Sequence, residues 1–491
     1  MSELFSSTLT EIAQAVQSQK RSAVEVTQAT LERIGALNPE INAYLYVDRE
    51  GALAAAAAVD RALRDNPGQA FPLAGVPIGI KDNLCTRGVR TTCASRILEG
   101  YIPPYDAHVV QQLRAAGAVP VGKLNLDEFA MGSSNENSAF GVVRNPWDRT
   151  RTPGGSSGGA AAATALGLGF ATLGSDTGGS VRQPASYCGV TAIKPTYGRV
   201  SRFGLIAFAS SLDQVGPLTR NMRDGARLLS VIAGHDPRDA TSAVVPVADY
   251  EAECGRDVRG LRVGVVKNIT EGCQPAVAAA FQTAVEQLSK RLGCEIVEVE
   301  LPHQRYALSV YYIVANAEAS SNLARFDGMR YGLRVTGEEL QNTYRKSRAA
   351  GFGAEVKRRI MLGTYVLSAG YYDALYLKAQ KVRTLIRDDY AKAFARCDVL
   401  LTPTAPSPAF KLGEIADPLA MYMQDIFTLP PSLAGIPAVS VPCGVSPEGL
   451  PLGLQLCAPH FEEARLVRLG HAYESVSGFE SLKLDGLAAT S

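Results

Sequence analysis

The stretch RTPGGSSGGAAAATALGLGFATLGSDTGGSVR, residues 151–182, contains two glycine-rich loops that each carry serine. The first loop, residues 154–159, surrounds Ser156, and the second, residues 174–180, ends at Ser180. Glycine lets other atoms approach closely, and successive backbone N–H groups in such a loop can converge on an anion. These are the requirements of a serine nucleophile that has an oxyanion hole built from its own backbone.

The segment between the two loops is apolar and rich in alanine. It predicts a tightly packed helix at about 159–167, followed by a short strand at about 169–173. A flexible Gly/Ser linker is the alternative reading of the composition. The core-like character of the intervening segment argues against that alternative.

The overall composition describes a globular chain. Of the 491 residues, 46% are hydrophobic and 20% are charged, and the formal net charge is +1, so no global field favours nucleic acid. The nine cysteines form no C-x-x-C pair, which favours reduced thiols and predicts no metal site. The N-terminus has no signal-peptide pattern, and no stretch of 18 apolar residues occurs, so we expect a cytoplasmic protein.

Strands and helices alternate along the whole chain, which predicts an α/β fold. We expect one large domain over residues 1–491, with a central mixed β-sheet covered by helices on both faces. N-terminal helices are expected at about 8–64, a catalytic core at about 70–235, and a mostly helical lid or partner region at about 305–396. The predicted strands are 73–80, 118–122, 169–173, 190–194, 261–266, 295–299, 398–402, 438–441 and 452–456.

A near match to a phosphate-binding loop occurs at Gly117-x4-Gly122-Lys123. The next residue is Leu124, whereas Mg²⁺ ligation needs Ser or Thr there, and the glycines flank a strand instead of a strand-to-helix turn. ATP binding by this element is therefore rejected.

The base that would activate a serine is a lysine rather than a histidine. The run 154–158 fits the G-x-S-x-G pattern of α/β-hydrolases, but no strand precedes it, and none of the five histidines has catalytic-looking neighbours. Lys81 directly follows the buried strand at 73–80, and ligands bind outside the carboxyl ends of such strands. Burial lowers the pKa of a lysine, so Lys81 is the best candidate base.

The segment around Lys81 and the two serine loops form a set of three motifs. Gly79-Ile-Lys81-Asp-Asn83, Gly154-Gly-Ser-Ser-Gly-Gly159 and Gly174-Ser-Asp-Thr-Gly-Gly-Ser180 together resemble the amidase signature family. The resemblance implies a Ser–cis-Ser–Lys triad, in which Ser180 is the nucleophile, Ser156 the bridging serine and Lys81 the base.

The resemblance has two further consequences for the serine loops. It implies a cis peptide between Gly155 and Ser156. It also implies that the N–H groups of residues 177–180 hold the oxyanion, namely those of Thr177, Gly178, Gly179 and Ser180.

A branch of that family is also indicated. Residues 127–134, 317–327, 355–364 and 368–373 are similar to the A subunits of bacterial tRNA-dependent amidotransferases. The similarity implies a glutaminase within a three-subunit enzyme. The B subunit would phosphorylate glutamate on Glu-tRNA(Gln) with ATP and Mg²⁺ and receive the ammonia, and the C subunit would clamp the pair. ATP and Mg²⁺ would then belong to the partner, and no cofactor to this chain.

Free glutamine carries an α-carboxylate and an α-ammonium, which need charged partners once they are buried. Similarity to the A subunits suggests Arg358 for the carboxylate, Asp425 for the ammonium and Tyr311 for an added hydroxyl. Arg359 competes with Arg358 as the matching position. The alternative is that these residues form salt bridges on a helix surface.

Two other functions are considered. One is a stand-alone amidase that acts on another small or aryl amide, and the other is a non-catalytic scaffold subunit of a tRNA-binding assembly. The intact Lys81, Ser156 and Ser180 count against the scaffold. Use of Asp-tRNA(Asn) as a second substrate would depend on the B subunit, and on the synthetases of the host.

Overall fold

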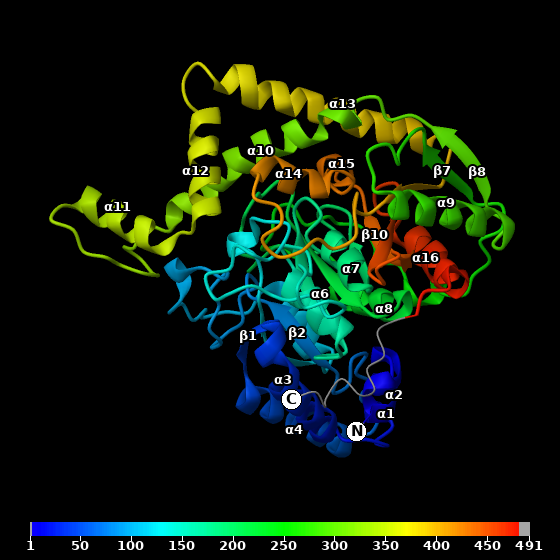
Figure 1. The fold of residues 1–491 in the computed structure, drawn as a ribbon. Coiled ribbons are helices and arrows are strands. Elements are labelled where there is room, and N and C mark those ends of the chain that lie inside the picture. The colour runs from blue at the N-terminus through cyan, green and yellow to red at the C-terminus, as the bar shows by residue number, and fades with distance from the viewer. Residues whose placement is uncertain (1, 481–491) are drawn as a thin grey trace.

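One mixed β-sheet runs through residues 2–480, the part of the chain that this computed structural model describes (Figure 1). Its eleven strands lie in the order β1-β3-β2-β4-β6-β5-β10-β11-β9-β7-β8. The strands β3, β2 and β4 are parallel, as are β9, β7 and β8, and the remaining neighbours pair antiparallel. The bounds are β1 Tyr44–Val47, β2 Pro77–Lys81, β3 Val119–Leu124, β4 Ala171–Asp176, β5 Thr191–Lys194, β6 Gln214–Thr219, β7 Arg262–Val266, β8 Glu295–Val299, β9 Val399–Pro403, β10 Ala438–Val445 and β11 Pro451–Cys457.

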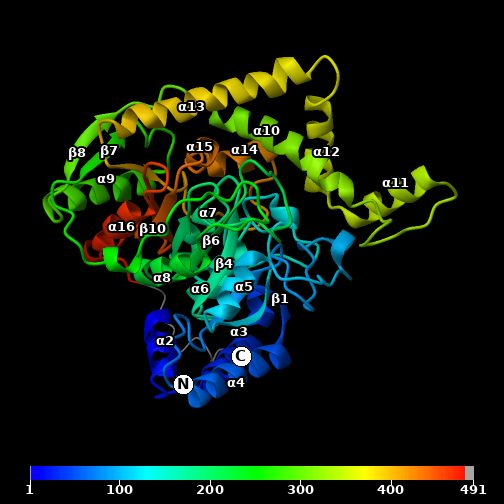
Figure 2. The same ribbon diagram turned by 180° about the vertical axis from the view of Figure 1, so that it is seen from behind.

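Helices pack on both faces of this sheet (Figures 1 and 2). Their bounds are α1 Ser2–Ser6, α2 Leu9–Gln17, α3 Ala23–Ile41, α4 Arg49–Asp65, α5 His108–Ala115, α6 Gly158–Ala165, α7 Arg182–Cys188, α8 Met222–Ile232, α9 Pro275–Lys290, α10 Ala307–Asn322, α11 Leu340–Gly351, α12 Ala354–Val366, α13 Lys378–Phe394, α14 Pro418–Tyr422, α15 Leu429–Ala434 and α16 Glu463–Ser477. Among residues 2–480, no helix has the length and apolar character needed to cross a membrane.

Two groups of helices lie at opposite ends of the sheet region. Figures 1 and 2 both place α1–α4 at one end and α10, α12 and α13 at the other, with α11 projecting outward. The expected helical region at about 305–396 is therefore present, and it also includes a π-helical turn, η6, at Tyr372–Leu377.

The expected helix and strand between the serine loops are confirmed as α6 and β4, with boundaries shifted by a few residues. Every residue of α6 is buried, and its small side chains allow close packing. A Cβ atom on Gly159 would lie 2.4 Å from the carbonyl oxygen of Asn125, so only glycine fits there. The nine strands predicted from the sequence are present as well, although β2 begins at Pro77 and not at residue 73.

Two strands, β1 and β6, were not predicted. The sequence of β6, Gln-Val-Gly-Pro-Leu-Thr, contains Gly216-Pro217, which is typical of turns and rare in central strands. In the fold, β6 lies between β4 and β5, and Pro217 pairs in register with Leu173. Pairing on both sides therefore overrides the local preference. β1 pairs with the edge of β3 and separates α3 from α4.

The sheet also sets the position of the serine loops. β2 and β4 are parallel neighbours, with Ile80 opposite Leu173. Their carboxyl ends therefore meet at the same edge. Lys81 is the last residue of β2, and the second serine loop begins at the end of β4 and continues beyond it, so the topology brings a lysine and a serine loop together.

Candidate active site

The side chain of Lys81 is completely buried among three serine hydroxyls. Its Nζ lies 2.8 Å from Ser156 Oγ, 2.8 Å from Ser157 Oγ and 3.0 Å from Ser175 Oγ. Ser157 comes from the first serine loop and Ser175 from β4. The lysine therefore joins the two serine-bearing segments through its amino group.

Burial controls the charge of this lysine. Loss of solvation lowers the pKa of Lys81 from its usual 10.5 to about 7, although Asp127, Asp176 and Asp213 favour the ammonium form. Near neutral pH a large fraction of Lys81 is thus uncharged and can accept a proton.

The peptide bond between Gly155 and Ser156 is cis, as predicted. Gly155 N–H donates to Gln183 Oε1 at 3.0 Å, and Asp127 N–H donates to Ser156 O at 3.2 Å. The carboxylate of Asp127 packs so tightly against Gly155 that a Cβ there would lie 2.1 Å from its Oδ2. The first serine loop is therefore held on both sides of the cis bond.

The second serine loop is anchored by a buried ion pair between Asp176 and Arg182. The guanidinium binds both carboxylate oxygens, at 3.0 Å through Nε and 2.9 Å through Nη2, and neither side chain is exposed. Ser180 is 7% exposed, and its carbonyl accepts a hydrogen bond from Ser157 N–H at 3.0 Å. This contact places Ser180 directly beside the first loop.

The structure revises one of the four expected oxyanion donors. Gly179 N–H donates to Asp176 Oδ1 at 2.8 Å, so this donor is already engaged in holding the loop. Gly179 has φ +143°, a conformation that L side chains rarely adopt. Within the described part of the chain, the N–H groups of Thr177, Gly178 and Ser180 form no hydrogen bond. These three remain available to a ligand.

Tyr311, on α10, lies against the second serine loop. A Cβ on Gly178 would come within 2.7 Å of its ring, and burial raises the pKa of the phenol well above its usual value. Thr428 contacts Gly178 as well, because Thr428 Oγ1 donates a hydrogen bond to Gly178 O at 2.6 Å. Tyr311 of the helical region and Thr428, the residue that precedes α15, therefore both lie against Gly178 of the second serine loop.

Asp425 is buried at the end of the short 3₁₀ helix η7, Met423–Asp425. Ser133 Oγ donates to its Oδ2, whereas Oδ1 has no hydrogen-bond partner among the described residues. Burial raises the pKa of Asp425 to about 7. Ser133 O in turn accepts from Gln183, the residue that binds Gly155, so Asp425 is linked to the cis-peptide loop.

The two candidate arginines on α12 face different surroundings. The side chain of Arg358 is 45% exposed and pairs with Glu355. The side chain of Arg359 is only 3% exposed, donates through Nε to Glu355 at 2.7 Å, and lies within 5.6 Å of the rings of Phe208, Tyr312 and Tyr422. Both Nη groups of Arg359 lack an acceptor in residues 2–480. Both arginines line a cavity of about 270 Å³.

Several residues that shape this site received no role from the sequence. Ser157 and Ser175 complete the surroundings of Lys81, and the Asp176–Arg182 pair fixes the second loop. Ser157 and Ser175 lie inside the quoted motifs, beside the assigned residues, so the motif itself carried the signal. The side-chain partners of Arg182, Gln455 and Ser432, are more than 200 residues away, and no local pattern could indicate them.

Lys123, the lysine of the rejected phosphate loop, is buried in β3 and donates to Leu84 O and to Thr91 Oγ1. Its amino group is therefore engaged within the protein.

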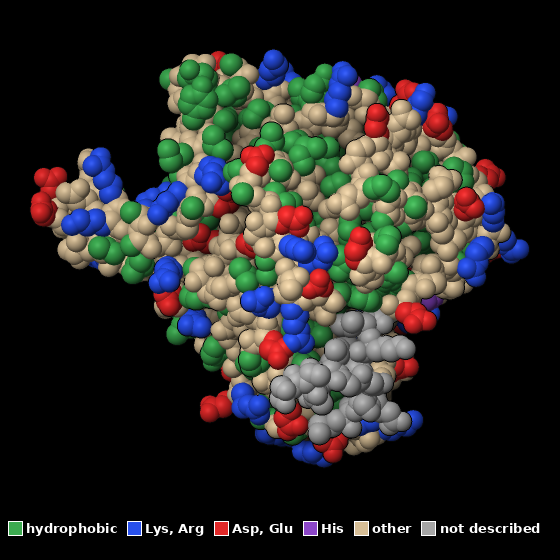
Figure 3. Space-filling model, in the orientation of Figure 1, with side chains coloured by type: hydrophobic (Ala, Val, Ile, Leu, Met, Phe, Trp, Pro, Cys, Tyr) green, Lys and Arg blue, Asp and Glu red, His purple; other side chains and the backbone are tan. Residues whose placement is uncertain are grey.

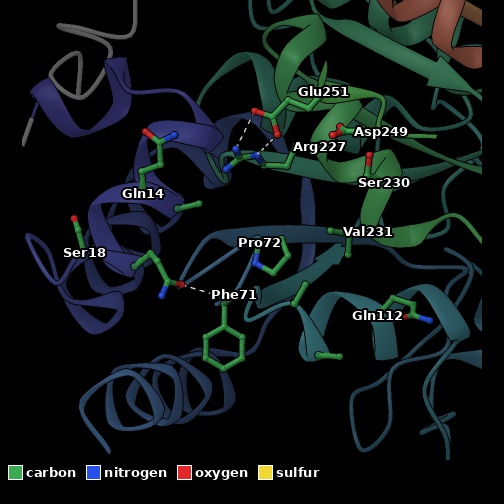
Figure 4. A pocket seen from close by; sticks show the side chains of 14 residues that line it. Gln14, Ser18, Phe71, Pro72, Gln112, Arg227, Ser230, Val231, Asp249 and Glu251 are labelled. Carbon is green, nitrogen blue, oxygen red and sulfur yellow. Dashed lines mark hydrogen bonds and ion pairs between the residues drawn. The ribbon is translucent and has the colours of Figure 1, made fainter. Parts of the chain in front are cut away.

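A separate cavity of about 690 Å³ lies between α2, α5 and α8 (Figure 4). Its Arg227 and Glu251 pair with each other at 2.7 Å, and neither serine loop lines it. The serine loops therefore remain the candidate active site.

Comparisons with known proteins agree with this geometry. The Amidase family model matches residues 25–467. The chain belongs to the Amidase family. Within this family it is 59% identical, over 94% of this chain and 96% of the relative, to the A subunit of glutamyl-tRNA(Gln) amidotransferase from Koribacter versatilis. It is 56% identical, over 99% of both chains, to the protein of the same name from Chloroflexus aggregans.

Solved structures of the Amidase family are similar along nearly the whole chain. The crystal structure of the glutamyl-tRNA(Gln) amidotransferase A subunit from Thermotoga maritima has a TM-score of 0.81 and 44% identity, covering 97% of this chain and 96% of that one. Peptide amidase from Stenotrophomonas maltophilia has a TM-score of 0.84 and 30% identity, covering 98% and 99%. The amidase fold with its mixed sheet is therefore confirmed.

Proposed function

We propose that this chain is the glutaminase subunit of a three-subunit Glu-tRNA(Gln) amidotransferase. The observation that carries the proposal is the contact of a buried lysine, Lys81, with Ser156 of a cis peptide at 2.8 Å, at the strand ends where the second serine loop begins. Identity of 56–59% to proteins named as the A subunit of glutamyl-tRNA(Gln) amidotransferase supports the choice among amidases.

The hydrogen bonds around Lys81 support a proton relay. A neutral amine has two N–H bonds and one lone pair. Ser157 Oγ donates to Ser175 O at 3.1 Å, and Asn83 donates to Ser175 Oγ at 2.9 Å, so both hydroxyls are suited to accept from Lys81. The lone pair of Lys81 is then directed to Ser156, whose hydroxyl donates to it. Ser156 in turn accepts the proton of Ser180.

The reaction follows from this relay. Ser180 Oγ attacks the side-chain amide carbon of glutamine, and its proton passes through Ser156 to Lys81. The N–H groups of Thr177, Gly178 and Ser180 bind the developing oxyanion, and each such donor typically contributes ~2.7–4 kcal/mol to lowering the barrier. Lys81 returns the proton through Ser156 to the departing ammonia. Water then hydrolyses the glutamyl ester at Ser180 and restores the hydroxyl.

Two unpaired polar groups suit the amino-acid end of glutamine. Asp425 Oδ1 is a buried acceptor without a donor, and the Nη groups of the buried Arg359 are donors without an acceptor in the described part of the chain. An α-ammonium and an α-carboxylate satisfy the first and the second, respectively, and a buried group left unpaired is costly. Arg358, the expected partner of the carboxylate, is the more exposed alternative.

The rest of the proposed reaction takes place on partner subunits. The B subunit uses ATP and Mg²⁺ to activate the glutamate of Glu-tRNA(Gln) and receives the ammonia, and the C subunit holds the two together.

An isotope label in the side-chain amide of glutamine tests this assignment. With the complete complex and amide-¹⁵N glutamine, the label is expected in Gln-tRNA(Gln). Turnover of another amide by the lone chain, with no label reaching tRNA, would instead identify a stand-alone amidase.

The proposed contacts of Asp425 and Arg359 with the α-ammonium and α-carboxylate of glutamine give a prediction about KM. Asp425→Asn and Arg359→Met are each expected to raise the KM for glutamine about 10- to 100-fold, because each leaves one charge of the substrate without its partner. Synthesis driven by ammonia should change little. Arg358→Met is the matched control on the same helix. A larger KM effect from Arg358→Met than from Arg359→Met would assign the carboxylate to Arg358.

Glu128 positions the helix that carries these arginines. Its carboxylate accepts from Ser95 Oγ and, at 2.8 Å, from the N–H of Gly353, the residue that precedes α12. Glu128→Gln replaces one of these acceptors by an amide NH₂. We expect the KM for glutamine to rise about tenfold, in line with a lost buried hydrogen bond, with kcat within about threefold of the parent.

Steady-state kinetics of Glu128→Gln alongside Glu253→Gln provide the check. Glu253 is also a buried carboxylate, but it pairs with Arg468 near α16, away from the serine loops. An equal rise in KM for both variants would reduce Glu128 to a general stabilising residue.

A further inference from the structure

The second half of α12 and the adjoining turn η6 expose a cluster of large apolar side chains. This α12–η6 patch consists of Met361, Leu362, Tyr365, Tyr371, Tyr372 and Leu377, which are between 36% and 72% exposed. Figure 3 shows the hydrophobic side chains gathered at the upper left, over the corner that joins α12 to α13 in Figure 1. None of the residues of η6 is buried.

The patch has the composition of a protein–protein interface. Isolated exposed apolar residues are common on monomers, whereas contiguous groups mark binding surfaces, and Tyr and Met are enriched at their centres. The rings are already ordered against each other. Tyr365 and Tyr371 have centroids 4.3 Å apart, and Tyr372 and Tyr376 are 5.3 Å apart. Such preordering reduces the entropy lost on docking.

Positive charges outnumber negative ones around the patch. Residues 357–387 contain seven Lys and Arg and a single acidic residue, Asp373, although Arg358 and Arg359 pair with Glu355 and Arg387 pairs with Asp388. In residues 2–480 neither Lys378 nor Lys381 has an acidic partner. The wider region 305–396 holds 16 Lys and Arg against 8 Asp and Glu, in a chain whose net charge is only +1. A docking partner complementary to this surface therefore carries carboxylates around its own apolar centre.

We infer that the α12–η6 patch is the docking site of a protein partner with an apolar centre and an acidic rim. This inference rests on the proposed function in one respect: the partner is another subunit of the proposed multi-subunit enzyme. A second copy of this chain would bring two positive rims together, which like charges disfavour. RNA would suit the lysines, but it offers nothing to the aliphatic side chains of Met361, Leu362 and Leu377. Because α12 also carries Arg359, the docked partner would lie close to the glutamine site.

The test measures assembly of the full chain with the B and C subunits from the same organism. The variant Met361→Ser/Tyr365→Ser/Tyr371→Ser removes exposed apolar groups, so the fold should be retained, as checked by circular dichroism. Its affinity for the partners is expected to fall at least about tenfold, since buried aromatic anchors dominate interfaces. The matched control is Val244→Ser/Val445→Ser, which alters exposed valines of 82% and 53% exposure outside the patch. Equal affinities of the two variants would overturn the inference.

A second pair of variants tests the rim. Lys378→Glu/Lys381→Glu is expected to slow association with the B and C subunits about tenfold or more at low salt, whereas Lys20→Glu, at the α2–α3 turn, is expected to have no effect. Unchanged association, or loss of tRNA binding while the subunits still assemble, would contradict a protein partner at this site. In all these variants, the isolated chain should hydrolyse glutamine at the same rate as the isolated parent chain. A parent complex that assembles but transfers no ammonia would refute the proposed function and leave the docking site intact.

Discussion

Ser180→Ala should abolish glutamine hydrolysis by the assembled enzyme, with a loss of kcat of about 10⁴-fold or more. The hydroxyl is the only atom group removed, and Ser180 is held through its backbone carbonyl by Ser157 N–H at 3.0 Å, so the loop geometry should persist. Release of glutamate from glutamine, measured with all subunits present, gives the result directly. Parent-like turnover in this variant would exclude Ser180 as the nucleophile.

Ammonia supplies the control for Ser180→Ala. The variant lacks only its ammonia source, so ammonium chloride is expected to restore formation of Gln-tRNA(Gln) to the ammonia-driven rate of the parent. Ser186→Ala is a matched substitution on α7, also buried but with no contact to Lys81, and it should keep glutaminase activity. If ammonia failed to rescue Ser180→Ala, the substitution would have damaged the complex and not the chemistry.

The serine loops show how far a sequence can predict a site. Lys81, Ser156 and Ser180 lie in short motifs, each at the end of a buried apolar strand or beside a helix of small residues, so their chemistry is readable locally. Parallel pairing of β2 with β4 then brings them together. What the motifs did not predict is the use of Gly179 N–H. The carboxylate of Asp176 takes that donor because Arg182 fixes its orientation from the next helix.

The amino-acid site was less predictable for a physical reason. Arg358 and Arg359 are adjacent, and a helix turns by about 100° per residue, so adjacent side chains face different surroundings. Which one is buried depends on Phe208, Tyr312 and Tyr422, which come from three separate parts of the chain. Strand β6 poses the same difficulty. Its Gly-Pro pair predicts a turn, and only its neighbours β4 and β5 make it a strand.

Lys81 gives the second large effect, which depends on pH. Its pKa of about 7 lies far below the usual value because burial disfavours the ammonium form. A base must be neutral, so kcat should be constant above pH 7 and fall about tenfold per pH unit below it. Under the proposed function, pairing with the substrate ammonium would keep Asp425 ionised in the enzyme–substrate complex. The kcat profile therefore reports Lys81, and Asp425→Asn should raise KM without moving the midpoint.

Substitution of the lysine separates its charge from its basicity. Lys81→Arg keeps a positive charge but cannot lose a proton, since a guanidinium stays protonated throughout the pH range of the assay, so kcat should fall by about 10³-fold or more at every pH. Lys194 offers a matched control, because burial also lowers its pKa to about 7, but its Nζ donates to Pro195 O rather than to a serine. Provided that circular dichroism shows a folded protein, Lys194→Met should retain the parent's midpoint near pH 7. A midpoint that disappears in Lys194→Met, but persists in Lys81→Arg, would transfer the role of base from Lys81 to Lys194.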